Sequence, residues 1–362
     1  MTESSELDAL LEWARSAGAS DLHLRAGRPP IVRIDGQLIP GKGAMLTNEM
    51  IDRMVDGMLP DHLRVSFKET HEADFAFGDE RLGRFRANAY HQRGLTTVAI
   101  RALREPSGSL TDLGLPPVME RLAAEPRGLI LVTGPTGAGK TTTLAAFIDV
   151  INRNRACNII TIEDPIEILH EDKKAMVSQR EVGVDTRGFA EALRRVLRQD
   201  PDVILVGEMR DMETVDAALT AAETGHLVLS TLHTLDAVET VNRILDFFPS
   251  DLQRQVRLLL AGSLRAVISQ RLLKRADGKG MIPAVEVLIN TERAAERIAD
   301  PTQTSALYDV ISEGEYYGMM TFDQSILQLL ELEQITFTEA MRHATRPSDL
   351  KVTAQRRGLI AT

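Results

Sequence analysis

This chain has few cysteine and aromatic residues and fewer basic than acidic ones, and each of these shortages excludes or disfavours a class of protein. It has one cysteine, Cys157, among 362 residues, which excludes an intrachain disulfide and a four-cysteine zinc site and is typical of a reducing compartment. Aromatic residues make up only 4%, which argues against a stacking platform for single-stranded nucleic acid. The 42 basic residues are outnumbered by 52 acidic ones, giving a net charge of −10, whereas proteins that grip a phosphate backbone are usually basic. We therefore expect no direct nucleic-acid partner.

Long apolar runs and a basic leader are also missing. No stretch approaches the roughly 18 apolar residues that a membrane-spanning helix needs. The first residues, MTESSELDALLEWARSAG, carry acids where a signal peptide needs positive charge. We expect a cytoplasmic protein without an integral membrane segment, so any membrane association has to come through a partner.

Residues 1–103 read as an α+β domain with an antiparallel sheet. Leu7, Leu10, Leu11 and Ala14 recur at helical spacing, and Gly18 suits the end of a helix over 5–17. The other elements predicted here are strands at 21–25, 73–77, 83–91 and 95–103, a hairpin at 31–39 that turns at Asp35 and Gly36, and helices at 47–58 and 60–70.

A segment rich in Gly, Pro and Ser, REPSGSLTDLGLPP at 104–117, is the best linker candidate. After it, apolar strands alternate with helical stretches, which predicts a mostly parallel sheet covered on both faces. These strands are expected at 128–133, 158–163, 202–207 and 226–231, with a helix at 142–152. The pattern turns almost entirely helical from about residue 290. The sequence thus predicts an α/β domain over 118–289 and a helical C-terminal subdomain over 290–362.

The strongest motif is a phosphate-binding loop between an apolar strand and a helix. It runs Gly134, Pro135, Thr136, Gly137, Ala138, Gly139, Lys140, Thr141, and Thr142 follows in the helix. Glycines let backbone N–H groups turn toward phosphates, and the helix N-terminus adds a positive dipole. In such loops the lysine reaches the β- and γ-phosphates and the hydroxyl after it ligates Mg²⁺, so we assign these roles to Lys140 and Thr141.

Two acids follow strands of the same predicted sheet. Glu163 ends the strand at 158–163, and Glu208 comes directly after the strand at 202–207. Functional loops gather at the carboxyl ends of parallel strands, so both acids are expected beside the phosphate loop. One acid would hold the metal and the other would deprotonate the attacking water. The alternative is that these carboxylates only cap the helices that follow.

Five motifs in this order give the chain a family resemblance. ASDLHLRAGRPPIVRIDG, GPTGAGKT, ITIEDPIE, LRQDPDVILVGEMRD and ETGHLVLSTLHT resemble the secretion ATPase superfamily of type II and type IV machines. The resemblance implies a PAS-like N-terminal domain, joined by a linker to a RecA-like P-loop ATPase domain. It also implies a ring of six subunits, with ATP between the two domains and near a neighbouring subunit.

The resemblance further implies residue roles. Glu163 would be the general base and Glu208 the metal-side acid of the Walker B motif. The residues matching the family's histidine box and its nucleotide-facing arginines are His226, His233, Arg194, Arg198 and, in the N-terminal domain, Arg86 and Arg101. Each has a plainer alternative, because a lone histidine is usually structural and surface arginines usually pair with acids.

Missing modules favour the pilus-retraction branch of this superfamily. Its assembly ATPases typically carry a four-cysteine zinc module and an extra N-terminal domain, whereas this chain has one cysteine and its PAS-like module begins almost at residue 1. The resemblance then implies an inner-membrane pilus platform protein as partner, and a paralogous retraction ATPase as another. The stretch MIPAVEVLINT at 281–291 leans toward that paralogue, so a slow helper ATPase stays an alternative, as does a DNA-transfer ATPase.

Overall fold

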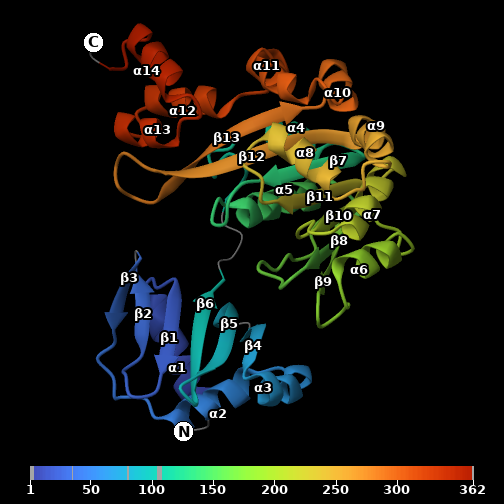
Figure 1. Ribbon diagram of the computed structural model, residues 1–362. Coiled ribbons are helices and arrows are strands. Elements are labelled where there is room, and N and C mark those ends of the chain that lie inside the picture. Colours follow the sequence, from blue (N-terminus) through green and yellow to red (C-terminus); the bar gives the residue numbers. More distant parts are fainter. Residues whose placement is uncertain (1–3, 35, 80, 104–107, 361–362) are drawn as a thin grey trace. The chain divides into compact units, whose positions relative to one another are not determined.

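The computed structural model describes residues 4–34, 36–79, 81–103 and 108–360. The chain forms two compact units (Figure 1). The first consists of Met1–Glu105 and Pro165–Leu169, and the second consists of Pro106–Asp164 and His170–Thr362.

The first unit is built around an antiparallel sheet of six strands, in the order β3-β2-β1-β6-β5-β4. Its elements in chain order are α1 (Ser4–Ser16), β1 (Asp21–Arg25), β2 (Ile31–Ile34), β3 (Gln37–Pro40), α2 (Asn48–Met58), the 3-10 turn η1 (Asp61–Leu63), α3 (Arg64–Thr70), β4 (Glu72–Asp79), β5 (Gly83–Gln92) and β6 (Leu95–Ala102). Every element predicted for this unit is present, while Asp35, predicted in the hairpin turn, lies outside the described residues.

Strand alternation explains how the first sheet buries one face. Leu22 and Leu24 of β1 are buried against α1 and α2. Asp21 and His23 alternate with them along the strand, so their side chains point to the opposite face of the sheet. Thr47 begins α2 as its N-cap, because its side chain accepts from the backbone N–H of Met50. The functional consequence is that the charged side chains of β1, β5 and β6 share the face away from the helices.

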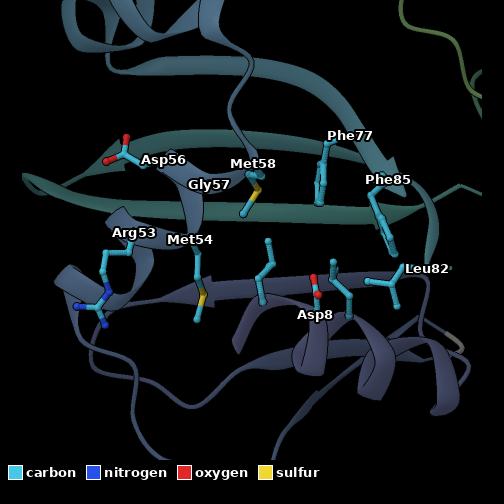
Figure 2. A pocket seen from close by; sticks show the side chains of 12 residues that line it. Asp8, Arg53, Met54, Asp56, Gly57, Met58, Phe77, Leu82 and Phe85 are labelled. Atoms are coloured by element: carbon cyan, nitrogen blue, oxygen red, sulfur yellow. The ribbon is translucent and has the colours of Figure 1, made fainter. Parts of the chain in front are cut away.

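A hollow of about 550 Å³ lies in the first unit between α1, α2 and the β4–β5 hairpin. Figure 2 shows Met54 and Met58 of α2 facing Phe77, Leu82 and Phe85 across it. None of the residues predicted to bind nucleotide lines this hollow, so it is separate from the predicted site.

The second unit holds a sheet of seven strands flanked by helices. Up to the last strand, its elements are α4 (Val118–Ala123), β7 (Gly128–Thr133), α5 (Lys140–Asn154), β8 (Asn158–Glu163), β9 (Met176–Glu181), α6 (Phe189–Val196), β10 (Val203–Val206), α7 (Met212–Glu223), β11 (Leu227–Leu232), α8 (Ala237–Asp246), α9 (Gln253–Ser263), β12 (Leu264–Lys274) and β13 (Met281–Ile289).

The seven strands lie in the order β13-β12-β7-β11-β10-β8-β9. All neighbours are parallel except β12 and β13, which form an antiparallel pair. This confirms the mostly parallel sheet, and β7 and β8 have the predicted bounds. The sequence did not predict β9, β12 or β13, so the sheet is wider than expected at both ends.

Helices cover both faces of this sheet, as predicted. One apolar core lies between the sheet and α4 and α5, and a second lies on the other face against α6 to α11. Alternation along a single strand serves both cores, since Leu129 and Leu131 of β7 face one and Ile130 and Val132 face the other.

The elements that follow β13 among the described residues are helices, apart from an isolated antiparallel bridge between Met320 and Val287 of β13, which confirms the predicted helical end. These elements are α10 (Glu292–Ala299), η2 (Thr304–Ala306), α11 (Leu307–Ser312), η3 (Glu315–Tyr317), α12 (Phe322–Glu331), α13 (Phe337–His343) and α14 (Pro347–Arg356). Figure 1 shows them gathered along the β12–β13 side of the second sheet. None of the helices in the described residues is long and apolar enough to cross a membrane.

The predicted linker at 104–117 falls at the division between the units. Its residues 104–107 lie outside the described residues. Farther along, Leu110 and Leu115 are buried in the core that contains α4 and α5, so this part of the segment is packed into the second unit.

Candidate active site

The phosphate loop connects β7 to α5, as the motif requires. Gly134, Gly137 and Gly139 have φ of +138°, +81° and +88°, which residues with a side chain rarely adopt. At Gly134 space is also restricted, because an added Cβ would lie 2.5 Å from the backbone oxygen of Gln270 on β12. The conformation of the loop therefore depends on glycine, and the backbone of β12 packs directly against Gly134.

Lys140 begins α5 and folds back over its own loop. Its Nζ donates to the backbone oxygens of Gly134 at 2.8 Å and Pro135 at 3.2 Å. Burial lowers the pKa of its ammonium, and the negative charge of Glu208 opposes that shift. Pro135, Thr136, Gly137, Thr141 and Thr142 are exposed around it. The ammonium and the N-terminus of α5 thus present positive charge at one exposed loop.

Glu208 follows β10 and sits in a cluster of charged groups at the same edge. One carboxylate oxygen lies 2.6 Å from the guanidinium of Arg210, and the other lies 3.6 Å from Nε2 of His233. Glu208 also acts electrostatically on Lys140. The structure thus brings Lys140, Glu208 and His233 together, and it adds Arg210, which the sequence analysis did not single out.

Glu163 ends β8 at the carboxyl edge of the sheet. Its Oε1 accepts a hydrogen bond from Thr161 Oγ1 at 2.6 Å and another from Gln179 Nε2 at 2.9 Å. The sequence analysis missed Thr161 and Gln179. Thr161 was detectable, because it precedes Glu163 by two residues on a predicted strand and so shares its face. Gln179 was not, since β9 was not predicted.

His226 lies at the opposite edge of the sheet from the phosphate loop. It precedes β11, and its backbone oxygen accepts from the N–H of Gly128 at the start of β7. Its Nδ1 donates to the Ala221 carbonyl at 2.9 Å, which fixes the tautomer because a carbonyl only accepts. The six residues of β11 span about 20 Å. The structure therefore separates His226 from His233, and His226 does not reach the phosphate loop of its own chain.

Arg194 and Arg198 are also away from this edge. Arg194 on α6 pairs with Glu213 of α7 at 3.3 Å, with both side chains exposed. Arg198 follows α6 and is adjacent to Gln199, whose backbone oxygen accepts from Asn158 at the amino end of β8. The structure does not bring either arginine to the phosphate loop of its own chain.

Comparison with protein families identifies the chain. The family model described as "Type II/IV secretion system protein" matches residues 7–351. This chain belongs to that family. It is 43% identical over 344 residues to the type IV pilus retraction ATPase PilT of Pseudomonas aeruginosa, covering 95% of this chain and 99% of PilT. It is 40% identical over 347 residues to the type IV pilus ATPase PilU of the same organism, covering 96% and 91%.

The solved structures give the same family assignment. A crystal structure of the pilus retraction motor PilT with bound ADP superposes with a TM-score of 0.88 at 43% identity, covering 94% of this chain and 98% of that one. The predicted superfamily and fold are thereby confirmed: an N-terminal α+β domain and a RecA-like ATPase domain.

Arg86 and Arg101 of this secretion-family chain lie in the first unit, side by side on β5 and β6. Arg86 forms a two-pronged hydrogen bond with Asp74, at 3.1 and 2.6 Å. Arg101 donates to Asp21 at 2.8 Å. Burial alone would raise the pKa of Asp21, but hydrogen bonds from Ser20 and Arg101 outweigh it and hold that pKa below its usual value. Both arginines are thus paired with carboxylates on the face away from the helices.

Proposed function

We propose that this chain is an ATP-hydrolysing motor of the type IV pilus that drives pilus retraction as a ring of six subunits. The observation that carries this is the complete phosphate loop between β7 and α5, with two acids at the same sheet edge, in a chain that matches PilT along 95% of its length. The comparisons confirm the predicted ATPase class. The relative PilT is a pilus retraction ATPase.

ATP binding rests on the loop and Lys140. The backbone N–H groups of the loop and the N-terminus of α5 point at the phosphates. Lys140 exchanges the carbonyls of Gly134 and Pro135 for phosphate oxygens. That exchange is favourable because a charge-assisted hydrogen bond to an anion is stronger than one to a neutral carbonyl.

The side chains at this edge fit a magnesium ion bound together with the nucleotide. Mg²⁺ takes one or two protein oxygens, keeps several waters and otherwise binds phosphate oxygens. Thr141 supplies an exposed hydroxyl beside Lys140 and Glu208 supplies a carboxylate at the same edge. When bound, the ion neutralises charge that develops on the phosphate oxygens. His233 orients Glu208 from the side.

Hydrolysis needs a base for the attacking water, and we assign that role to Glu163. Its carboxylate takes the water proton while the water oxygen attacks the γ-phosphorus, which releases phosphate and ADP. Lys140 stabilises the negative charge on the transferred group.

Arg194, Arg198 and His226 do not reach the phosphate loop within the described part of the second unit, whereas Arg86 and Arg101 belong to the first unit. We assign Arg194, Arg198 and His226 to the nucleotide of a neighbouring subunit in the ring. Arg86 and Arg101 would close over the nucleotide from the N-terminal domain, exchanging Asp74 and Asp21 for phosphate oxygens.

The proposed setting is the cytoplasm, at the inner face of the cytoplasmic membrane. The load is an inner-membrane pilus platform protein, and a paralogous retraction ATPase is a second partner. We propose no direct nucleic-acid partner, which fits the net charge of −10.

The test is steady-state ATP hydrolysis across a protein-concentration series, with native mass recorded at each point and Glu163→Gln measured beside the wild type. Specific activity should rise as the hexamer forms, and the variant should bind ATP but keep only a slow residual hydrolysis, measurable in single turnovers. Wild-type turnover in Glu163→Gln would remove Glu163 as the base. Rings that bind ATP and barely hydrolyse it would favour the helper role suggested by the similarity to PilU, and stimulation by DNA would favour a DNA-transfer ATPase.

A further inference from the structure

The side chain of Gln179 has a fixed orientation at the end of the second sheet. Its Oε1 accepts from the backbone N–H of His170 at 2.8 Å. An amide oxygen only accepts and an amide nitrogen only donates. The His170 N–H therefore determines which end of the amide faces Glu163, and that end is the donor, Nε2, 2.9 Å from Glu163 Oε1.

The strand register brings a second donor to the same oxygen. β8 and β9 are parallel, with Thr161 directly beside Gln179. Thr161 and Glu163 are two residues apart on β8, so their side chains share one face of the sheet. Thr161 is 1% exposed and donates to Glu163 Oε1 at 2.6 Å. One carboxylate oxygen thus receives two donors from two strands.

We propose that Gln179 and Thr161 are positioning residues that hold the carboxylate of Glu163 in the orientation needed to take the proton of the attacking water. This inference rests on the proposed role of Glu163 as the base. The carboxylate cannot rotate about its Cγ–Cδ bond without breaking both hydrogen bonds. A base that is misplaced or turned away loses much of its catalytic effect, because proton transfer requires hydrogen-bond distance and alignment.

The positioning role differs from a purely structural one in what it leaves unchanged. Neither residue belongs to the phosphate loop, so nucleotide affinity should not depend on them. Both act through one carboxylate, so their loss should matter only while that carboxylate is present. These two consequences define the experiment.

The main variant is Gln179→Leu, which removes the donor while keeping a side chain of similar length. We expect kcat to fall by about 10- to 100-fold, with KM and the affinity for ADP within about twofold of wild type. Gln179→Glu keeps the acceptor for His170 and places an anion against Glu163, so its kcat should fall at least as far. Ser178→Ala, on the same strand and exposed, is the matched control and should turn over like wild type.

The second pair of variants tests the same hydrogen-bonded oxygen from β8. Thr161→Val removes the hydroxyl and keeps the shape, so it should lower kcat, and Thr161→Ser should restore it. If Gln179→Leu does not fold, this pair carries the test by itself.

Single-turnover rates in a Glu163→Gln background separate the possible failures. If the residues act through Glu163, adding Gln179→Leu there should cause no further loss. A further loss of equal size would overturn the inference. So would an unchanged kcat in Gln179→Leu, Gln179→Glu and Thr161→Val while Glu163→Gln loses most of its turnover. Wild-type turnover in Glu163→Gln alone would instead show that the proposed base is wrong, and the positioning role would fall with it.

Discussion

Glu286 of β13 is a buried carboxyl group whose titration should be visible in the stability of the second unit. It is 4% exposed, and its Oε1 accepts from the N–H of Ala237, the first residue of α8, at 2.9 Å. Its pKa is raised from 4.5 to about 7, chiefly by burial, with Asp236 and Asp323 adding to the shift and Arg271 and the Ala237 N–H opposing it.

The sign of the effect follows from that shift. The folded pKa lies above the unfolded one, so between pH 4.5 and about 7 the folded state holds the proton more tightly. The free energy of unfolding therefore falls as the pH rises through this window, by about 3 kcal/mol in total. Glu286→Gln keeps an oxygen for the Ala237 N–H and removes the titration. Relative to wild type, the variant should gain about 2 kcal/mol of stability between about pH 5.5 and about pH 8.

Urea unfolding followed by far-UV circular dichroism would measure this difference, without nucleotide and at constant ionic strength. The single tryptophan, Trp13, packs in the first unit, so its fluorescence serves as an internal control that should not respond to the substitution. Glu223→Gln, at an exposed position of α7, is the matched control variant. A stability difference between Glu286→Gln and wild type that is the same at both pH values would refute the reasoning, as would a variant that loses stability relative to wild type as the pH rises.

Three further substitutions test the site. Lys140→Ala should weaken ADP binding by about 100-fold, since it removes the ammonium aimed at the phosphates; unchanged affinity in a calorimetric titration would count against the loop assignment. Gly134→Ala should destabilise the fold by about 3 kcal/mol, because its φ of +138° and the Gln270 oxygen at 2.5 Å leave no room for a Cβ, and thermal denaturation measures this. Arg194→Ala should slow turnover more than it weakens binding, while loss of its exposed pair with Glu213 costs under about 1 kcal/mol; if turnover is unchanged, the ion pair is the only role left for Arg194.

The sequence predicted the centre of the second sheet well because burial on both faces leaves an unbroken apolar run. GLILVT and NIITIE have that pattern, and β7 and β8 have the predicted bounds. β12 was missed because Ser269 and Gln270 interrupt its apolar pattern. Both are buried, and each bonds to a side chain distant in sequence: Thr133 donates to Ser269, and Nε2 of Gln270 donates to Thr143. β9 was missed because its residues are mostly polar, as suits the edge of a sheet.

Some residues of the predicted site could be placed from the local sequence pattern, whereas the positions of others depend on the order and direction of the strands. The loop, Glu163, Glu208 and His233 follow the carboxyl ends of strands, and a parallel sheet brings such ends to one edge. His226 and His233 fall within one short motif, yet β11 lies between them and places them at opposite edges. The partners of Arg86 and Arg101 depended on strand pairing, which no local pattern of residues reveals.

β12, one of the three strands that the sequence missed, links the phosphate loop to the C-terminal helices. Along β12, Ser269 bonds to Thr133 at the end of β7, and the backbone of Gln270 closes the space beside Gly134. Beyond this point the same strand and its partner β13 supply Leu273, Ile282 and Ala284 to the core formed with α12, α13 and α14. Arg271, between these two regions, lies over the ring of Phe322 on α12 at 3.8 Å. Residues 269–273 therefore contact the phosphate loop at one end and the helical subdomain at the other. A displacement of β12 would change the contacts of both regions.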